Sequence, residues 1–258
     1  MLLAIDIGNS HIVMGGFEGE KLCFSARFRT DSLKTETEYA VLIKNALELY
    51  AVSPDDITGG IISSVVPPLS GTVKQAVRLI KKVRVLVIGP GMKTGLNIKI
   101  DNPAQLGADL LTTAIGAMEK YPLPAVVIDL GTATKMTVID KDGCFRGGAI
   151  MPGVMIALEA LSSKTAQLPK ISLEANQIDP IGTNTVDCMK AGTILGTASM
   201  IDGMIERYHA ALGEKITVVA CGGLTNAIIP HCKSTIISDE TLLLDGLRVL
   251  YQKNTAEK

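Results

Sequence analysis

Two stretches of this 258-residue chain repeat one pattern at a distance typical of a duplicated domain. Residues 2–10 read LLAIDIGNS, and residues 125–133 read AVVIDLGTA. Each is an apolar run that ends in Asp, an apolar residue and Gly, and small or polar residues follow. In both copies a second apolar run then leads to a Glu-Gly or Asp-Gly hairpin signal. The repeat predicts two similar halves, each opening with a strand, a tight turn and a β-hairpin.

Helical and strand patterns alternate after each opening. Thr35 and Glu38 have the spacing of a capping box at the start of a helix. Only 3% of the residues are aromatic, so the core must be aliphatic, which suits strands buried on both faces. We predict two α/β domains with a cleft between them, covering 1–113 and 114–258. Further helices are expected at 69–80, 193–211 and 242–250, and further strands at 61–66, 83–88 and 216–220.

Charge and cysteine content exclude several classes of protein. The formal net charge is −1, so nucleic acid is not expected as a partner. The longest apolar runs are too short to cross a bilayer, so no membrane association is expected. The five cysteines are scattered and form no CxxC pair, which indicates reduced thiols in a cytoplasmic protein.

The first turn has the residues of a phosphate and magnesium site. Asp6 ends a buried strand, and Gly8 lets the backbone approach a ligand closely. A carboxylate repels phosphate unless Mg²⁺ lies between them, so we predict that Asp6 holds Mg²⁺. An Asp that merely caps a turn is the alternative, which the second copy disfavours. The predicted nucleotide-binding stretch is Asp6, Ile7, Gly8, Asn9, Ser10, His11, Ile12 and Val13.

Two later turns complete the predicted nucleotide site. Thr132 follows Asp129 in the second copy and is expected to face the β- and γ-phosphates of ATP. Gly222 and Gly223 follow the predicted strand at 216–220 and would let adenosine lie against the backbone. A simple helix-start turn is the alternative for the paired glycines.

These three turns resemble the phosphate-1, phosphate-2 and adenosine motifs of the acetate kinase, sugar kinase, Hsp70 and actin superfamily. The resemblance implies an actin-like ATPase fold of two ribonuclease-H-like domains. Along nearly its whole length the chain is similar to the type III pantothenate kinases. The matching stretches are 62–67 (ISSVVP), 102–109 (NPAQLGAD), 129–134 (DLGTAT), 147–153 (GGAIMPG), 165–169 (TAQLP) and 181–185 (IGTNT).

The resemblance implies ATP-dependent phosphorylation of pantothenate to 4'-phosphopantothenate, the first step of coenzyme A biosynthesis. It makes Asp109 the general base, although an Asp at a helix start also has a capping role. It places a monovalent cation, K⁺ or NH₄⁺, on Asp129, and it implies a homodimer with its contact at or near 147–192. Thr185 would touch pantothenate across that contact. The implied substrate-binding residues are Gly107, Ala108, Asp109, Leu110, Thr185 and Ile100.

Four positions depart from the family pattern. Leu110 replaces an Arg, Ile100 a Tyr, Thr113 an Asn and Lys135 a hydroxyl residue. An Arg is the natural partner of the carboxylate of pantothenate. The alternative function is therefore an inactive paralogue, either a nucleotide-binding regulator or a partner subunit. The retained Asp109 favours the kinase, and a sugar kinase or a filament-forming actin relative fits less well.

Overall fold

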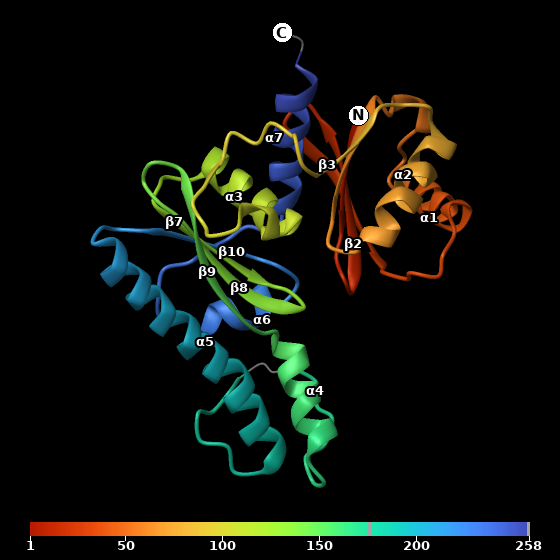
Figure 1. Cartoon of the computed structure of the whole chain (residues 1–258). Coiled ribbons are helices and arrows are strands. Elements are labelled where there is room, and N and C mark those ends of the chain that lie inside the picture. The colour runs from red at the N-terminus through yellow and green to blue at the C-terminus, as the bar shows by residue number, and fades with distance from the viewer. Residues whose placement is uncertain (175–176, 257–258) are drawn as a thin grey trace. The chain divides into compact units, whose positions relative to one another are not determined.

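The computed structural model describes residues 1–174 and 177–256 of the chain. Over those residues the chain forms two compact α/β units, each built on one sheet (Figure 1). The units differ from the consecutive stretches 1–113 and 114–258 predicted from the sequence, because the last helix belongs to the first unit. The first unit consists of Met1–Gly95, Asn102–Glu119 and Leu242–Lys258, and the second of Leu96–Asp101 and Lys120–Thr241.

The first unit has a five-stranded sheet, in the order β3-β2-β1-β4-β5, across the described residues. Strands β1, β2 and β3 pair antiparallel, as the predicted hairpins require, whereas β4 and β5 run parallel to β1. The carboxyl ends of β1 and β4 therefore lie at the same edge of the sheet. The strands are β1 (Leu2–Ile7), β2 (His11–Glu18), β3 (Lys21–Arg29), β4 (Gly59–Ser64) and β5 (Val85–Val87).

Helices cover both faces of this sheet. Helices α1 (Glu36–Leu49) and α2 (Pro67–Ile80) share a buried apolar cluster with Leu3, Ile5 and Ile7 of β1. The capping box of Thr35 and Glu38 is confirmed, with the Thr35 N–H donating to the Glu38 carboxylate at 2.8 Å. Short 3₁₀ turns span Pro54–Asp56 and Pro103–Gln105.

Helix α7 (Leu242–Thr255) covers the opposite face and contacts β1 and β4. A Cβ at Gly59 would collide with Tyr251 of α7, so the helix lies directly on the strand. Helix α3 (Ala108–Lys120) crosses α7 just as closely, since a Cβ on Gly116 would collide with the Leu242 carbonyl. This packing explains why α7, which is distant in sequence, belongs to the first unit.

The second unit repeats the plan. Its six-stranded sheet, among the described residues, has the order β11-β10-β7-β8-β9-β6. The β7–β8–β9 strands pair antiparallel like β1–β2–β3, and β10 lies parallel to β7 as β4 lies parallel to β1. The duplicated openings predicted from the sequence are confirmed. The strands are β6 (Asn97–Ile98), β7 (Ala125–Leu130), β8 (Ala133–Ile139), β9 (Cys144–Pro152), β10 (Thr217–Cys221) and β11 (Ile237–Ser238).

The long helix α5 (Thr185–Leu212) packs on this sheet through Ile194, Ala198 and Ile201, which share a buried cluster with β7 and β8. It begins before the predicted residue 193, because Asn184 caps it by accepting the Asp187 N–H. Smaller helices are α4 (Val154–Lys164), α6 (Thr225–Ile228) and the 3₁₀ turn Ile229–His231. Across residues 1–174 and 177–256, none of the helices combines the length and apolarity needed to span a membrane.

Candidate active site

The turn between β1 and β2 is held rigidly. The Gly8 N–H donates to the His11 carbonyl at 3.0 Å, which closes the turn. Thr30, just after β3, fixes it from the side: its hydroxyl donates to the Gly8 carbonyl at 2.7 Å and its N–H to the Ser10 carbonyl at 3.0 Å. Asn9 is exposed, as are Ser10 and His11. The turn therefore presents its donors to solvent on a fixed backbone, as an anion site requires.

Asp6 stands at the end of β1 with its carboxylate half-buried. Its register partners are Ser63 on β4 and Val13 on β2, and Val13 in turn pairs with Arg27 on β3. Paired residues of neighbouring strands point to the same face, so these four side chains form one row across the sheet. The Ser63 hydroxyl is fully buried and makes no hydrogen bond within the described part of the chain. Oxygen groups beside Asp6 are the ligand type that Mg²⁺ prefers, so the residues present fit that ion.

The surroundings of His11 disfavour its charged form. Burial lowers the pKa of His11 from its ordinary value of 6.5, and the neighbouring Arg27 and Arg29 lower it further. The positive charge near this turn therefore comes from the two arginines of β3.

The corresponding turn of the second unit joins β7 to β8. The Gly131 N–H donates to the Ala133 carbonyl at 3.2 Å, and Thr132 is exposed. Asp129 occupies the place of Asp6, but its register partner is Lys135. The Lys135 ammonium lies 2.7 Å from Oδ2 of Asp129, and each side chain is only 16% exposed. The resemblance makes Asp129 the ligand of a monovalent cation, but its carboxylate already forms an ion pair with the Lys135 ammonium.

The predicted adenosine turn lies beside this second turn. Gly222 has a φ of 100°, a conformation that other residues rarely adopt. A Cβ on Gly222 would also crowd the backbone of Leu130 at the end of β7. The Leu224 N–H donates to the Leu130 carbonyl at 3.3 Å. The structure therefore brings the residues 131–134 and 222–225 together, as the prediction of one nucleotide site requires.

Asp109 lies in the first turn of α3, in the same unit as Asp6. Its carboxylate is half-buried and its Oδ1 accepts the Leu110 N–H at 2.9 Å. Gly107 leaves space for it, since a Cβ there would lie 2.5 Å from Asp109 Oδ1. Asp109 is the second residue of α3, so it lies inside the helix and not at the N-cap position of the capping alternative.

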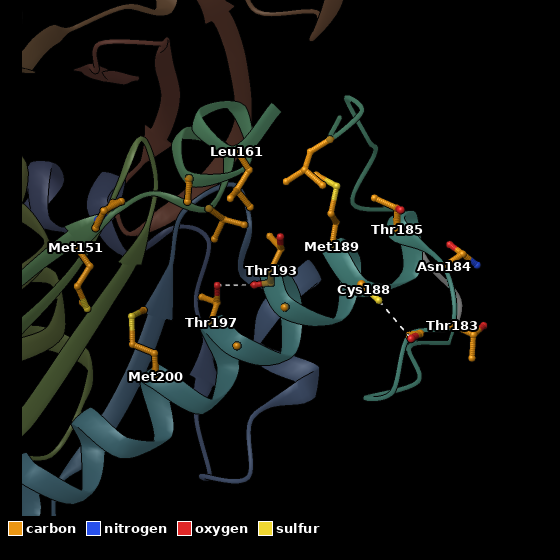
Figure 2. Close-up of a pocket in the computed structure, with 17 residues that line it drawn as sticks. Met151, Leu161, Thr183, Asn184, Thr185, Cys188, Met189, Thr193, Thr197 and Met200 are labelled. Carbon is orange, nitrogen blue, oxygen red and sulfur yellow. Dashed lines mark hydrogen bonds between the residues drawn. The ribbon is translucent and has the colours of Figure 1, made fainter. Parts of the chain in front are cut away.

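Gly107, Ala108 and Leu110 lie beside Asp109 in the first unit, whereas the predicted substrate residues Ile100 and Thr185 belong to the second unit. Ile100 is half-buried and lies next to Gly147, where an added Cβ would be 3.6 Å from its side chain. Thr185 opens α5 and lines a pocket of about 870 Å³ between α4 and α5 (Figure 2). The pocket wall is mixed: Met151, Leu161, Met189 and Met200 are apolar, whereas Thr183, Asn184, Thr185, Thr193 and Thr197 carry polar groups.

Solved structures share this fold over nearly the whole chain. A putative Baf family transcriptional activator from Campylobacter jejuni matches with a TM-score of 0.55, 18% identity and coverage of 98% of this chain and 97% of its own. A putative 2-dehydro-3-deoxygalactonokinase from Sinorhizobium meliloti matches with a TM-score of 0.54, 11% identity and coverage of 100% and 99%. Such low identities show the fold alone. The chain has the actin-like ATPase fold of two ribonuclease-H-like domains that the sequence predicts.

A sequence model described as type III pantothenate kinase matches residues 2–207. The chain belongs to the type III pantothenate kinase family. Relatives of that name come from an Exiguobacterium species, with 41% identity over 98% of this chain and 99% of the relative, and from Halalkalibacterium halodurans, with 40% identity over 98% and 100%. A further relative from Myxococcus xanthus is 39% identical over 99% and 100%. The resemblance recognised in the sequence is confirmed.

Sequence reasoning missed the contacts that flank the two carboxylates. Ser63 and Arg27 join the row of Asp6 only through strand pairing, and Lys135 meets Asp129 only through the register of β7 and β8. Aligning the two openings would have placed Met136 opposite Asp129, because Asp6 pairs with Val13, seven residues on, whereas Asp129 pairs with Lys135, six residues on. Nothing in the sequence indicates the role of Thr30, because its hydrogen bond to Gly8 forms only when the end of β3 lies beside the first turn.

Proposed function

We propose that the chain transfers the γ-phosphoryl group of ATP to the primary hydroxyl of pantothenate, giving 4'-phosphopantothenate and ADP in the cytoplasm. The observation that carries this proposal is full-length similarity: relatives about 40% identical over 98% of the chain are named type III pantothenate kinase. Small-molecule phosphorylation also fits the net charge of −1, since no basic surface for nucleic acid is expected.

ATP is proposed to bind through the three turns. The turns of Gly8 to Ser10 and of Gly131 to Thr134 receive the phosphates through backbone N–H groups other than those of Gly8 and Gly131, which close the turns. Gly222 and Gly223 receive the adenosine. Asp6 would hold Mg²⁺, and the ion would supply neutralisation of the phosphate charge. The fit rests on the half-buried Asp6 carboxylate beside the Ser63 hydroxyl. The family resemblance also implies a monovalent cation on Asp129, but the Lys135 ammonium already lies beside that carboxylate.

Asp109 is proposed as the general base. Its carboxylate takes the proton of the pantothenate hydroxyl as that oxygen forms a bond to the γ-phosphorus, and the bond from phosphorus to the bridging oxygen of ADP breaks. The hydrogen bond from the Leu110 N–H to Oδ1 supports the role, because it orients the carboxylate. Gly107, Ala108 and Leu110 form the backbone around it, while Ile100 and Thr185 are proposed to contact pantothenate.

An assay of ADP release with and without pantothenate tests the activity directly. Pantothenate-dependent release supports the kinase. If the wild-type chain releases no ADP above the background rate, the proposed function fails and a regulatory or partner-subunit role gains.

Leu110→Arg is expected to lower the KM for pantothenate by roughly tenfold to a hundredfold, with a smaller effect on kcat. The reason is that a guanidinium beside Asp109 would pair with the substrate carboxylate, a contact made in the ground state and kept in the transition state. Steady-state kinetics with varied pantothenate measure it. Leu110→Met is the matched control, because it conserves volume without adding charge. An unchanged KM in the Arg variant would place residue 110 away from the carboxylate.

A homodimer is also proposed, with its contact at or near 147–192. Large apolar side chains of this region are exposed: Ile150 to 72%, Met155 to 50% and Ile156 to 47%. Exposed apolar surface gathered in one region is typical of an interface. Sedimentation of the full chain is expected to give twice the monomer mass, and Ile150→Asp is expected to shift it toward the monomer. A monomer mass that does not change with concentration would contradict the dimer.

A further inference from the structure

The aspartates of the two duplicated turns have different neighbours on the adjacent strand. Asp6 has the apolar Val13 as its partner on the adjacent antiparallel strand, and the cation of its row, Arg27, is two strands away. That separation is roughly 9–10 Å between backbones. Asp129 has Lys135 on the adjacent strand, with the ammonium 2.7 Å from its Oδ2. The second half of the duplication therefore places an ammonium directly on its carboxylate, whereas the register partner of Asp6 in the first half is apolar.

The ion pair between Asp129 and Lys135 is largely buried. Each side chain is only 16% exposed, so solvent screens this pair less than it screens a surface ion pair. Their strands are hydrogen-bonded in register, so the backbone already holds the two residues side by side.

A monovalent metal ion does not fit beside this pair. An ion on the Asp129 carboxylate would lie within a few ångströms of the ammonium, and two like charges at that separation repel strongly where water is scarce. The carboxylate would also have to share its charge between two cations.

We propose that Lys135 is a fixed cation built into the second turn, so that this chain binds nucleotide without K⁺ or NH₄⁺. The proposal rests on the proposed function for its ligand, a nucleotide phosphate. The ammonium cancels the charge of Asp129 beside the backbone N–H groups of residues 131–134. Anionic phosphate then meets a neutral carboxylate–ammonium pair instead of a bare negative charge. Lys135 acts here as a positioning residue through Asp129.

The test compares ATP affinity in two salts. ATP with Mg²⁺ is titrated into the full chain by calorimetry, in KCl or in tetramethylammonium chloride at the same ionic strength. Tetramethylammonium is too bulky to replace K⁺ on a carboxylate. The wild-type affinity and melting temperature are expected to agree between the salts, the affinity within about twofold, because screening is matched. A wild-type affinity or melting temperature that rises specifically with K⁺ would overturn the proposal.

Three variants sharpen the comparison. Lys135→Thr leaves Asp129 open to an ion, so its ATP affinity is expected to fall roughly tenfold in tetramethylammonium and to recover in K⁺. Lys135→Arg keeps the charge and is expected to stay indifferent to K⁺. Lys141→Thr is the matched control, since Lys141 is exposed in the next turn, and it is expected to behave as the wild type. If Lys135→Thr binds ATP like the wild type in both salts, the pair is merely structural and the proposal is wrong.

The outcomes separate this proposal from the proposed function. If the wild type binds ATP equally in both salts but releases no ADP with pantothenate, the kinase activity fails and the fixed cation stands. If Lys135→Thr does not fold, Lys135→Arg and the wild-type salt series still decide, because both keep the ion pair.

Discussion

Asp109→Asn is expected to lower kcat for pantothenate phosphorylation by about 10²–10⁴-fold, the usual contribution of a positioned general base. The amide has the shape of the carboxylate but cannot take the proton of the pantothenate hydroxyl. ATP affinity is expected to stay near that of the wild type, because the nucleotide turns lie elsewhere in the chain. Steady-state kinetics measure the first effect, and calorimetric titration of ATP measures the second.

The alternative role of Asp109 is to stabilise the first turn of α3. The free energy of unfolding and kcat together distinguish this structural role from the general-base role. Its carboxylate accepts the Leu110 N–H, and a negative charge in the first turn stabilises a helix by typically 0.3–1 kcal/mol. A purely structural role therefore predicts a small loss in the free energy of unfolding and an almost unchanged kcat. Asp101→Asn is the control, because Asp101 is an exposed carboxylate shortly before α3. A normal kcat in Asp109→Asn would remove the general base from the mechanism.

Leu110→Arg and Asp109→Asn also test the alternative hypothesis that the chain is an inactive paralogue. A wild-type chain without activity, combined with a Leu110→Arg variant that is also inactive, would favour a regulator or a partner subunit. Activity in the wild type that Asp109→Asn abolishes would establish the kinase.

The duplicated openings could be predicted from the sequence because their signals are local. An apolar run, an Asp, a Gly and a hairpin signal lie within a few residues of one another, so strand order and pairing follow from them. The structure confirms these hairpins as β1–β2–β3 and β7–β8–β9. Residues 131–134 and 222–225 were also expected to meet, and parallel pairing of β7 with β10 brings them together.

The remaining features depend on long-range packing, which leaves no local signal. In the sequence, α7 follows the second repeat and is therefore expected to belong to the second domain. In the structure it contacts β1 and β4 of the first unit, because Gly59 and Gly116 leave space for it. The start of α5 was predicted too late, since the apolar periodicity begins well after the cap at Asn184. In the candidate site, the position of Lys135 was noted as unusual, but its contact with Asp129 needed the register.

Asp6→Asn is expected to lower turnover at saturating Mg²⁺ by roughly 10²–10³-fold and to raise the Mg²⁺ concentration needed for half-maximal rate. A metal ion contributes several kcal/mol of charge stabilisation in phosphoryl transfer, and a neutral amide holds Mg²⁺ far less tightly than a carboxylate. The register partner of Asp6 is the apolar Val13, whereas that of Asp129 is Lys135, so Asp6 is the proposed metal ligand of the two. The measurement is the rate as a function of Mg²⁺ concentration at fixed ATP.

Folding must be followed in parallel, because Asp6 is half-buried at the centre of a sheet. Asn has nearly the same volume, so the free energy of unfolding is expected to change by about 1 kcal/mol or less, far too little to explain the loss of turnover. Asp56→Asn serves as the control, since Asp56 is an exposed carboxylate of the same unit. Its Mg²⁺ dependence is expected to match the wild type. If Asp6→Asn turned over normally at limiting Mg²⁺, the metal would be held by other groups, and the asymmetry between Asp6 and Asp129 would have no role in binding it.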